Sequence, residues 1–407
     1  MRFVKLGATA LVGVFLAGAT VAPAVFAQTP PAAVQVSRDL VTPLNEARAA
    51  IVAKDWPTAT AKLTAAAAKA KTPVDKAQID RLRLVMAAET KDFPGQLSSI
   101  NGLLASGTLT PDEIKQYKGA LIKIYADMGD TAKSLAASRE YVDSYGGTHD
   151  MMAALANDYA KAGDNANSLL YVDKAIAAAR AAGAKPPEPY YRLKARVHQG
   201  LKDQPGYYKT LEAILADYPK ESYWVELIAR AQNEPQYGAA TRLDMYRTLI
   251  AAGVTLTAEQ KANAAHEAIE RGLPGEALGL LESAGALNSE RDKENLENAK
   301  TQAPKDKAGL AAETASIVSK GDASAIASIG EAHLSYGDYP KAVELLQSAI
   351  SKGIANASEA DVARLHLGIA QYRSGDKDGA RATWAAIKAD NGAAVLAQNW
   401  ILISQLK

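Results

Sequence analysis

The sequence predicts an all-α protein, a superhelical solenoid of antiparallel helix pairs. Alanine fills stretches such as residues 65–68, and aromatic residues make up only 6% of the 407 residues. This composition favours closely packed helices, because alanine has the highest helix propensity and orders no side-chain rotamers. Gly-Asp turns recur at a spacing of about 34 residues, as between Gly129 and Gly163. No run of alternating apolar residues indicates a strand. In such an array each pair is expected to bury its apolar side only against its neighbours.

The charge balance and the cysteine count exclude several classes of function. Lys and Arg number 46 against 45 Asp and Glu, a formal charge of +1. A chain so balanced carries no net field that would steer it to nucleic acid or an anionic membrane, so neither is expected as a partner. Cysteine is absent. This excludes disulfides, thiolate metal sites, cysteine nucleophiles and a bacterial lipoprotein anchor.

Residues 1–27 have the pattern of a secretory signal peptide. Arg2 and Lys5 precede an apolar stretch of small residues, and Val25-Phe26-Ala27 supplies the residues that a signal peptidase reads. An uncleaved anchor is the alternative, but glycines and a proline make the stretch weakly hydrophobic and short for a membrane span. We therefore expect an exported protein, periplasmic or secreted, with a flexible linker at 28–39 and no stable membrane insertion of the mature chain.

Two segments near the C-terminus, 328–342 and 365–380, share one pattern. Each has a first helix with Gly near its middle, a Gly-Asp turn, and an Ala shortly after that turn. Both closely resemble the tetratricopeptide repeat. We expect small residues where the two helices of a pair cross, because larger side chains would push the backbones apart. The residues at these positions are Gly330, Ala342, Gly368 and Ala380.

The same register, extended toward the N-terminus with decreasing quality, predicts about ten helix pairs and a capping helix at 393–407. It divides the chain into a degenerate N-terminal array at 40–287 and C-terminal pairs at 308–392. Further turns are expected at Lys54-Asp55, Lys91-Asp92, Gly129-Asp130, Gly163-Asp164, Lys202-Asp203, Asn233-Glu234, Gly272-Leu273 and Ala303-Pro304.

The stretch between these arrays, 288–307, breaks the pattern. Acidic and basic residues crowd it, and Leu296 is almost alone as a core candidate. Mixed charges at helical spacing indicate a solvated helix with ion pairs one turn apart. The alternative is a hinge between two arms. Both interpretations predict weak packing here.

No catalytic or metal-binding pattern stands out in the sequence. The chain has no Gly-rich phosphate loop and no Gly-x-Ser-x-Gly elbow. Ser374-Gly375-Asp376-Lys377 matches the Ser-x-x-Lys pattern of acyl-enzymes, but these residues form the turn of a repeat. Hence we expect no enzyme, no cofactor and no metal. Five histidines lie far apart without metal-ligand spacing and are interpreted as packing or surface residues: His149, His198, His266, His333 and His366.

The resemblance implies a concave groove lined mainly by residues of the first helices. Basic residues outnumber acidic ones among the candidates, which suits a protein or peptide partner with carboxylates. The alternative is that these charges only solvate exposed helix faces. In the family's best-known peptide clamp, Lys and Asn hold a C-terminal carboxylate; Ala153 stands where that Lys should be, so this specificity is not transferred. The candidates are Lys123 and Asp127, Asn157 and Lys161, Arg192 and Arg196, and Tyr223 and Arg230.

Three functions follow as hypotheses. The leading one is a non-enzymatic exported scaffold that binds an extended partner segment in the groove, in envelope assembly or secretion. The second is a module that binds a glycan or cell-wall polymer, which needs a stacking row of aromatic residues such as Tyr223 and Tyr372. The third is a helical enzyme acting on peptidoglycan. It would need a catalytic Glu and a separate lysozyme-like domain, for which ten helix pairs leave no length.

The C-terminal helix is unusually apolar for the end of a solenoid. Leu396, Trp400 and Ile403 fall on one face, and a second apolar cluster lies further around the helix. Either the helix tilts so that both clusters pack on the preceding pair, or the uncovered face is a self-association or partner surface. The residues of that possible interface are Trp400, Ile401, Leu402 and Leu406.

Overall fold

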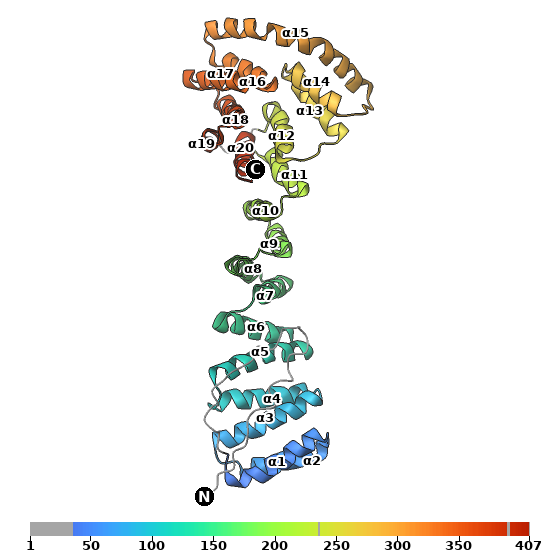
Figure 1. The fold of residues 1–407 in the computed structure, drawn as a ribbon, viewed down its shortest axis with the longest axis vertical. Coiled ribbons are helices and arrows are strands. Elements are labelled where there is room, and N and C mark those ends of the chain that lie inside the picture. The colour runs from blue at the N-terminus through green and yellow to red at the C-terminus, as the bar shows by residue number, and fades with distance from the viewer. Residues whose placement is uncertain (1–35, 235–236, 389–390, 407) are drawn as a thin grey trace. The chain divides into compact units, whose positions relative to one another are not determined.

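The computed structural model describes residues 36–234, 237–388 and 391–406. Within these ranges the chain forms helices and no strand, which confirms the all-α solenoid (Figure 1). Its contacts divide it into two compact units, with the boundary in sequence between Ala178 and Ala179. The predicted signal peptide and most of the predicted linker lie outside the described residues. None of the helices in the described part is long and apolar enough to cross a membrane.

The N-terminal unit is a stack of helix pairs. It contains α1 (Arg38–Val52), α2 (Trp56–Lys69), α3 (Pro73–Glu89), α4 (Phe93–Ala105), α5 (Pro111–Asp127), α6 (Thr131–Tyr145), α7 (His149–Lys161) and most of α8 (Asn165–Ala181). Leu40, Leu63 and Ile79 lie in one buried apolar cluster of α1 to α3, and Leu103 and Ile124 lie in the next, formed by α3 to α5. The core is therefore built from one pair to the next, as a repeat array requires.

The C-terminal unit begins with more pairs and ends with a helix that folds back. It contains α9 (Glu188–Gly200), α10 (Gln204–Asp217), α11 (Glu221–Ala229), the 3₁₀ helix η1 (Arg230–Asn233), α12 (Ala239–Ala252), α13 (Ala258–Glu270), α14 (Pro274–Ser283), α15 (Glu290–Lys320), α16 (Ala323–Ser335), α17 (Tyr339–Lys352), α18 (Ala357–Arg373), α19 (Lys377–Ala385) and α20 (Gly392–Leu406).

Six helix pairs turn through the same local structure. A residue with positive φ precedes an aspartate whose carboxylate accepts a hydrogen bond from the backbone N–H three residues on, at the start of the second helix. Lysine takes the positive-φ position at Lys54, Lys91 and Lys202, with φ of 57°, 55° and 58°. In the other three glycine does so, without the steric cost that a Cβ brings. The aspartates are Asp55, Asp92, Asp130, Asp164, Asp203 and Asp376, which confirms the turns expected at these places.

The crossing points of the last two pairs have no room for larger residues. A Cβ placed on Gly330 would lie 2.9 Å from Cγ of Leu346, and one on Gly368 would lie 2.2 Å from Nε1 of Trp384. Ala342 and Ala380, at the matching positions of the second helices, are fully buried. These contacts confirm the requirement for small side chains.

The prediction of a turn at Ala303-Pro304 is wrong, because α15 continues through these residues as one helix of 31 residues. Its first half packs on α14 through Ala299, and its second half packs on α16 through Leu310. Ion pairs three residues apart, such as Lys293 with Glu290, line its exposed side. Packing at both halves keeps the helix continuous although Pro304 lacks a backbone N–H. The described part of the chain therefore has nine helix pairs, the single helix α15 and the terminal helix α20.

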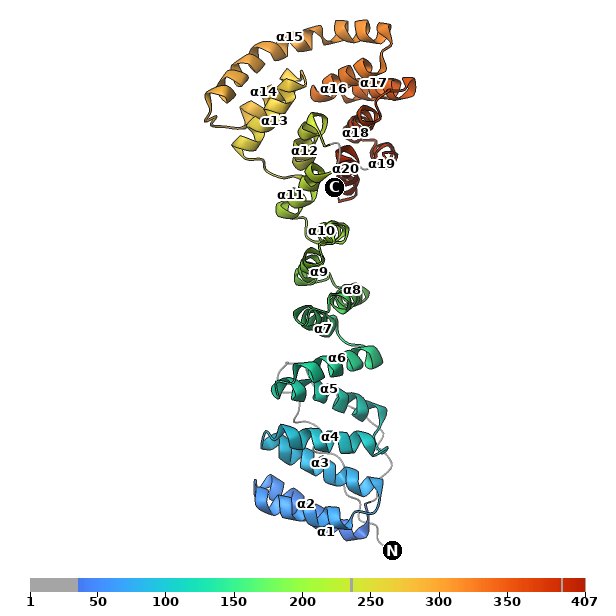
Figure 2. The same ribbon diagram turned by 180° about the vertical axis from the view of Figure 1, so that it is seen from behind.

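The expectation that every pair packs only against its neighbours is also wrong in the C-terminal unit. Helix α20 packs against α12, α18, α19 and η1, so α12 and α20 lie side by side although the chain between them forms seven other helices (Figure 2). Helices α11 to α20 thus close on themselves. The physical reason is the apolar character of α20 on more than one face, which one preceding pair cannot cover.

Of the proposed C-terminal interface, Trp400 is already used for packing. Its ring is fully buried and stacks on Trp384 with centroids 5.5 Å apart, and Leu396 and Ile403 are also fully buried. Ile401 and Leu402 are half-buried, and Leu406 is 37% exposed. Self-association through this helix stays a prediction. Of the proposed interface residues, Ile401, Leu402 and Leu406 are those still accessible for it.

Candidate functional site

The pocket that carries the predicted groove residues lies on α9, α10 and α11. It has a volume of about 180 Å³. Helix α9 contributes Arg192, Ala195, Arg196 and Gln199, which follow one another at helical spacing and so share one face. The deeper residues come from α10 and include Thr210, Leu211 and Ile214, and Tyr207 and Tyr223 also line the pocket. The site is therefore an apolar recess with aromatic residues, two arginines and the Glu226 carboxylate around it.

Hydrogen bonds to carboxylates orient the tyrosines of the pocket. The Tyr223 hydroxyl donates to Oε1 of Glu188 at 2.6 Å, and Lys220 Nζ donates to Oε2 of the same carboxylate at 2.6 Å. The Tyr207 hydroxyl donates to Glu226. Each phenol thus has a partner within the protein, which fixes the direction of its ring.

These contacts keep the phenols protonated. Burial and the bond to Glu188 raise the pKa of Tyr223 to about 12. Burial and the Glu226 carboxylate raise the pKa of Tyr207 as well. The bonds from Lys220 and Tyr223 hold the pKa of Glu188 below its usual range. At neutral pH the pocket therefore presents neutral phenols beside an ionised carboxylate, and none of them is poised to exchange a proton.

The two arginines at the pocket are its exposed cations. Arg192 and Arg196 lie one helical turn apart on α9, and both are exposed. A guanidinium binds carboxylates in a bidentate manner, so two of them one turn apart form a surface that selects negative charge. The structure thus brings Arg192, Arg196 and Tyr223 into one site.

Arg230, the fourth candidate of this region, is engaged elsewhere. Its guanidinium lies 5.0 Å from the ring centre of Tyr208, pairs with Glu212 at 3.7 Å and donates to Gln398 at 2.8 Å. Gln398 belongs to α20, so Arg230 joins η1 to the terminal helix.

The remaining candidates lie in the N-terminal unit and pair locally. Lys123 bonds Asp127 at 2.8 Å on α5, and Lys161 bonds Asp158 at 3.1 Å on α7. Asn157 is a half-buried residue of α7. These residues lie outside the α9–α11 pocket, and their role in partner binding stays a prediction.

Sequence reasoning missed the contribution of the second helix. Tyr207, Thr210 and Leu211 line the pocket from α10, whereas the repeat register considered only residues of first helices. The signal was present in the sequence, because Tyr207 and Tyr208 stand four and five residues after Asp203, near the start of the second helix.

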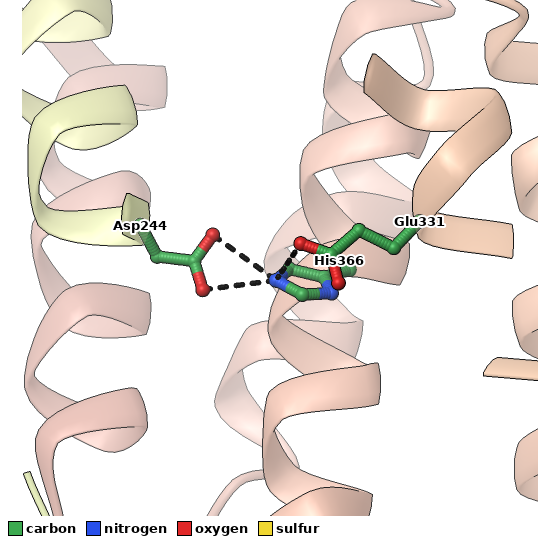
Figure 3. Close-up of side chains that lie close together, drawn as sticks. All are labelled: Asp244, Glu331 and His366. Atoms are coloured by element: carbon green, nitrogen blue, oxygen red, sulfur yellow. Dashed lines mark hydrogen bonds and ion pairs between the residues drawn. The ribbon is translucent and has the colours of Figure 1, made fainter. Parts of the chain in front are cut away.

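A second cluster of polar groups lies inside the C-terminal unit, away from solvent. Asp244 on α12 is fully buried, and both of its oxygens lie within 3.0 Å of Nε2 of His366 on α18 (Figure 3). Glu331 on α16 lies 3.6 Å from the same nitrogen. Arg247 Nη1 donates to Asp244 and to Glu331 at 2.8 Å each, and Arg271 Nη2 donates to Glu331 at 2.6 Å.

Opposite charges outweigh burial in this cluster. Burial alone would raise the pKa of Asp244 and of Glu331, but His366, Arg247 and Arg271 hold both values below the usual range. Burial would lower the pKa of Arg247, but Glu276, Asp244 and Glu331 raise it. The carboxylates of Asp244 and Glu331 therefore stay ionised and the guanidinium of Arg247 stays charged in the folded protein.

Asp244, Glu331 and His366 have the composition of a metal site, with donor atoms within 4.8 Å of one another. The surrounding residues do not fit one. Arg247 already bonds both carboxylates, and a metal bound to the same oxygens at about 2.0–2.2 Å would lie against its guanidinium charge. We interpret the cluster as an ion-pair network.

Comparisons with known proteins agree with the helix-pair architecture. Residues 362–391 match the family model of the tetratricopeptide repeat. No curated protein matches the chain. Solved structures that resemble the chain include the following three. A tetratricopeptide repeat protein from Parabacteroides merdae has 11% identity and a TM-score of 0.30 over 81% of this chain and 100% of its own. The structure of Naa15/Naa10 bound to HypK-THB has 14% identity and a TM-score of 0.29 over 88% of this chain and 60% of its own. The TPR2AB domain of yeast Sti1 in a pHSP90 complex has 12% identity and a TM-score of 0.22 over 72% of this chain and 100% of its own.

Proposed function

We propose that this chain is a non-enzymatic scaffold that binds an extended, acidic segment of a partner protein at the α9–α11 pocket. The match of residues 362–391 to the tetratricopeptide repeat and the helix pairs of the described chain support this proposal. The observation that carries the proposal is the placement of Arg192 and Arg196 beside a recess with apolar and aromatic walls. A segment that inserts one side chain and places a carboxylate nearby would use both features.

The size of the pocket supports a peptide segment over a larger small molecule. Pockets for drug-sized ligands have volumes of about 300–1,000 Å³, and this one has about 180 Å³. One side chain of a partner fills such a volume, and the rest of the segment would lie along the exposed face of α9. Affinity would come from that anchor and from contacts to the two guanidiniums.

The chemistry of the pocket supports binding rather than catalysis. Its phenols are protonated and bonded to carboxylates, so they neither attack a substrate nor accept a proton at neutral pH. The buried cluster around His366 is closed to substrates, since His366 is only 2% exposed. We infer that neither place supplies an enzyme activity.

The glycan hypothesis needs an aromatic row that Tyr223 and Tyr372 do not form together. Tyr372 packs on Trp384 and Trp400, with ring centroids 6.2 and 5.7 Å apart. Tyr223 instead bonds Glu188 at the pocket. A sugar could still stack on Tyr223 and Tyr207, so this alternative remains one outcome of the binding test.

Export is the second half of the proposal. It rests on the signal-peptide pattern of residues 1–27, and it would place the scaffold in the periplasm or outside the cell, in envelope assembly or secretion. Fusing residues 1–35 to a reporter that is active only after export tests this part separately. A reporter that stays inactive would remove the export proposal and leave the binding proposal intact.

The binding proposal is tested with labelled peptides and fluorescence anisotropy. Peptides with one apolar residue beside Asp or Glu should bind, and matched peptides with Asn or Gln should bind less tightly. Arg192→Glu with Arg196→Glu should weaken binding at least about tenfold, while the melting temperature changes little because exposed charges contribute little to folding.

The matched control is Lys69→Glu with Lys76→Glu, which changes two exposed lysines of the N-terminal unit. This variant should bind like the wild type. Equal binding by the Arg192 and Arg196 variant would show that the arginines only solvate the helix. Binding of peptidoglycan fragments in place of peptides would favour the glycan hypothesis.

A further inference from the structure

The buried ion-pair network joins two arms of the C-terminal unit. Asp244 and Arg247 lie on α12, Arg271 directly follows α13, and these belong to the arm α12–α14. Glu331 on α16 and His366 on α18 belong to the arm α16–α18. The bonds between the arms connect residues 84 and 122 positions apart in sequence. They are thus long-range contacts that the repeat itself does not provide.

The charge of the network depends on one residue. It contains three carboxylates, from Asp244, Glu276 and Glu331, and two guanidiniums, from Arg247 and Arg271. With a neutral imidazole the network has one uncompensated negative charge in a buried place, which is costly. With an imidazolium it is balanced.

The geometry favours a proton on Nε2 of His366. That nitrogen lies 2.9 and 3.0 Å from the two oxygens of Asp244, 3.6 Å from Glu331 and 3.5 Å from Nη1 of Arg247. Carboxylate oxygens only accept, so the two short contacts to Asp244 require a proton on Nε2. Among the side chains in this network, histidine is the type whose unperturbed charge changes between about pH 5 and 8.

In the described part of the chain, several charged groups on the helices around α18 form pairs that do not involve His366. Helix α20 carries no ionisable side chain. On α16, His333 pairs with Asp338. On α17, Lys341 pairs with Glu344 at the surface, and on α19, Arg381 pairs with Asp378 there. On α18 itself, Asp361 pairs with Arg364. The charged groups that contact His366 directly are Asp244, Glu331 and Arg247, which all belong to the network.

We propose that His366 is a protonation-dependent clasp. As an imidazolium it balances the network and holds the arms α12–α14 and α16–α18 together. Loss of the proton as the pH rises leaves a buried negative charge between Asp244 and Glu331 and loosens the contact between the arms. The proposal is independent of the peptide pocket.

Distance measurements between spin labels on the two arms test the clasp. The chain has no cysteine, so Asn263→Cys on α13 and Gln347→Cys on α17 place two labels at exposed positions without background. In the full-length protein the distance distribution should be narrow at pH 5.5 and become broader and longer at pH 8.5.

Two substitutions separate charge from shape. His366→Gln keeps a neutral donor and should show the broad distribution at both pH values. His366→Lys keeps a permanent cation and should show the narrow one at both. The control His266→Gln changes a half-buried histidine of α13 that contacts Arg291 outside the network, and it should keep the response of the wild type.

Nitrogen chemical shifts of the His366 ring in the unsubstituted protein give a second readout that needs no variant to fold. The proposal requires the imidazolium in the narrow state and the neutral ring in the broad one. It is overturned if the distance distribution is the same at pH 5.5 and 8.5, or if the ring is neutral while the arms are closed.

Discussion

The two units of this chain use the same helix pairs but hold them together over different distances in sequence. In the described part of the N-terminal unit the polar bonds between helices join residues at most 38 positions apart, such as Lys118 with Glu140 and Ser37 with Asp75. In the C-terminal unit they reach 84 to 168 positions, as in Arg247 with Glu331 and Arg230 with Gln398. The same repeat therefore gives an open stack in one unit and a closed one in the other.

This difference predicts where cooperativity lies. In an open stack each pair depends on its neighbours, and a local change has a local effect. In a closed unit, removing one contact between distant helices weakens every helix of the closure. The following predictions are designed to break or sharpen this contrast, and hydrogen exchange can follow both units in one sample.

Removing α20, by ending the chain before residue 391, should have the largest effect. Loss of Trp400 and Leu396 would leave a large apolar surface on α12, α18 and α19 exposed. We expect faster exchange throughout α11–α19, including α12, which lies far away in sequence. Exchange of α1–α6 should not change. Fast exchange confined to α18 and α19 would contradict the closure.

Arg247→Met should have the next largest effect on stability, because it leaves Asp244, Glu276 and Glu331 without their shared cation. Removing one partner of a buried ion pair costs about 3–5 kcal/mol. The matched change in the open unit is Arg81→Met, whose pair with Glu113 is 2.5 Å long but partly exposed, and should cost about 0–1 kcal/mol. Denaturation of both variants measures the contrast, and equal losses would show that the network is not a special feature.

Asp75→Asn tests a buried polar contact of the open unit. The buried Asp75 carboxylate accepts bonds from Ser37, Lys71 and Thr72. Losing these should cost about 1–3 kcal/mol, with fast exchange limited to α1 and α3. A loss that spreads to α5 and α6 would mean that the N-terminal unit is more cooperative than an open stack.

The same residue gives a pH dependence of opposite sign to that of His366. Burial alone would raise the pKa of Asp75, but the hydrogen bonds from Ser37, Lys71 and Thr72 hold that pKa below its usual range. Because the folded value is lower than the unfolded value of about 3.9, Asp75 stabilises the unit above that pH, and this contribution is lost as the pH falls. Acid titration followed by exchange of α1 and α3 should show it, and the Asn variant should lack it.

Leu406→Lys should have the smallest effect on stability, within about 0.5 kcal/mol, since Leu406 is 37% exposed. Sedimentation of wild type and variant then asks whether this end of α20 serves self-association. Loss of an oligomer with unchanged stability would support the interface, and a large drop in stability would show that Leu406 is needed for packing instead.

The turns show how far local sequence determines this structure. An Asp after a residue in the left-handed region caps the next helix within three residues, so the signal and its effect lie side by side in the chain. The same holds for Gly330 and Gly368, whose partners Leu346 and Trp384 come from the next helix. Arg192, Arg196 and Tyr223 could be placed on one groove because α9 and α11 follow each other in the repeat.

What the sequence could not determine depends on contacts between distant segments. The repeat period predicts a turn at Ala303-Pro304, but packing on both α14 and α16 keeps α15 continuous. The meeting of Asp244 with His366, 122 positions apart, depends on how far the helices curl before α20 reaches α12. Local signals of a few residues determine each helix pair. Small rotations from one pair to the next accumulate along an array. The closure by α20 and the buried charges within it are therefore determined only when the whole C-terminal unit has folded.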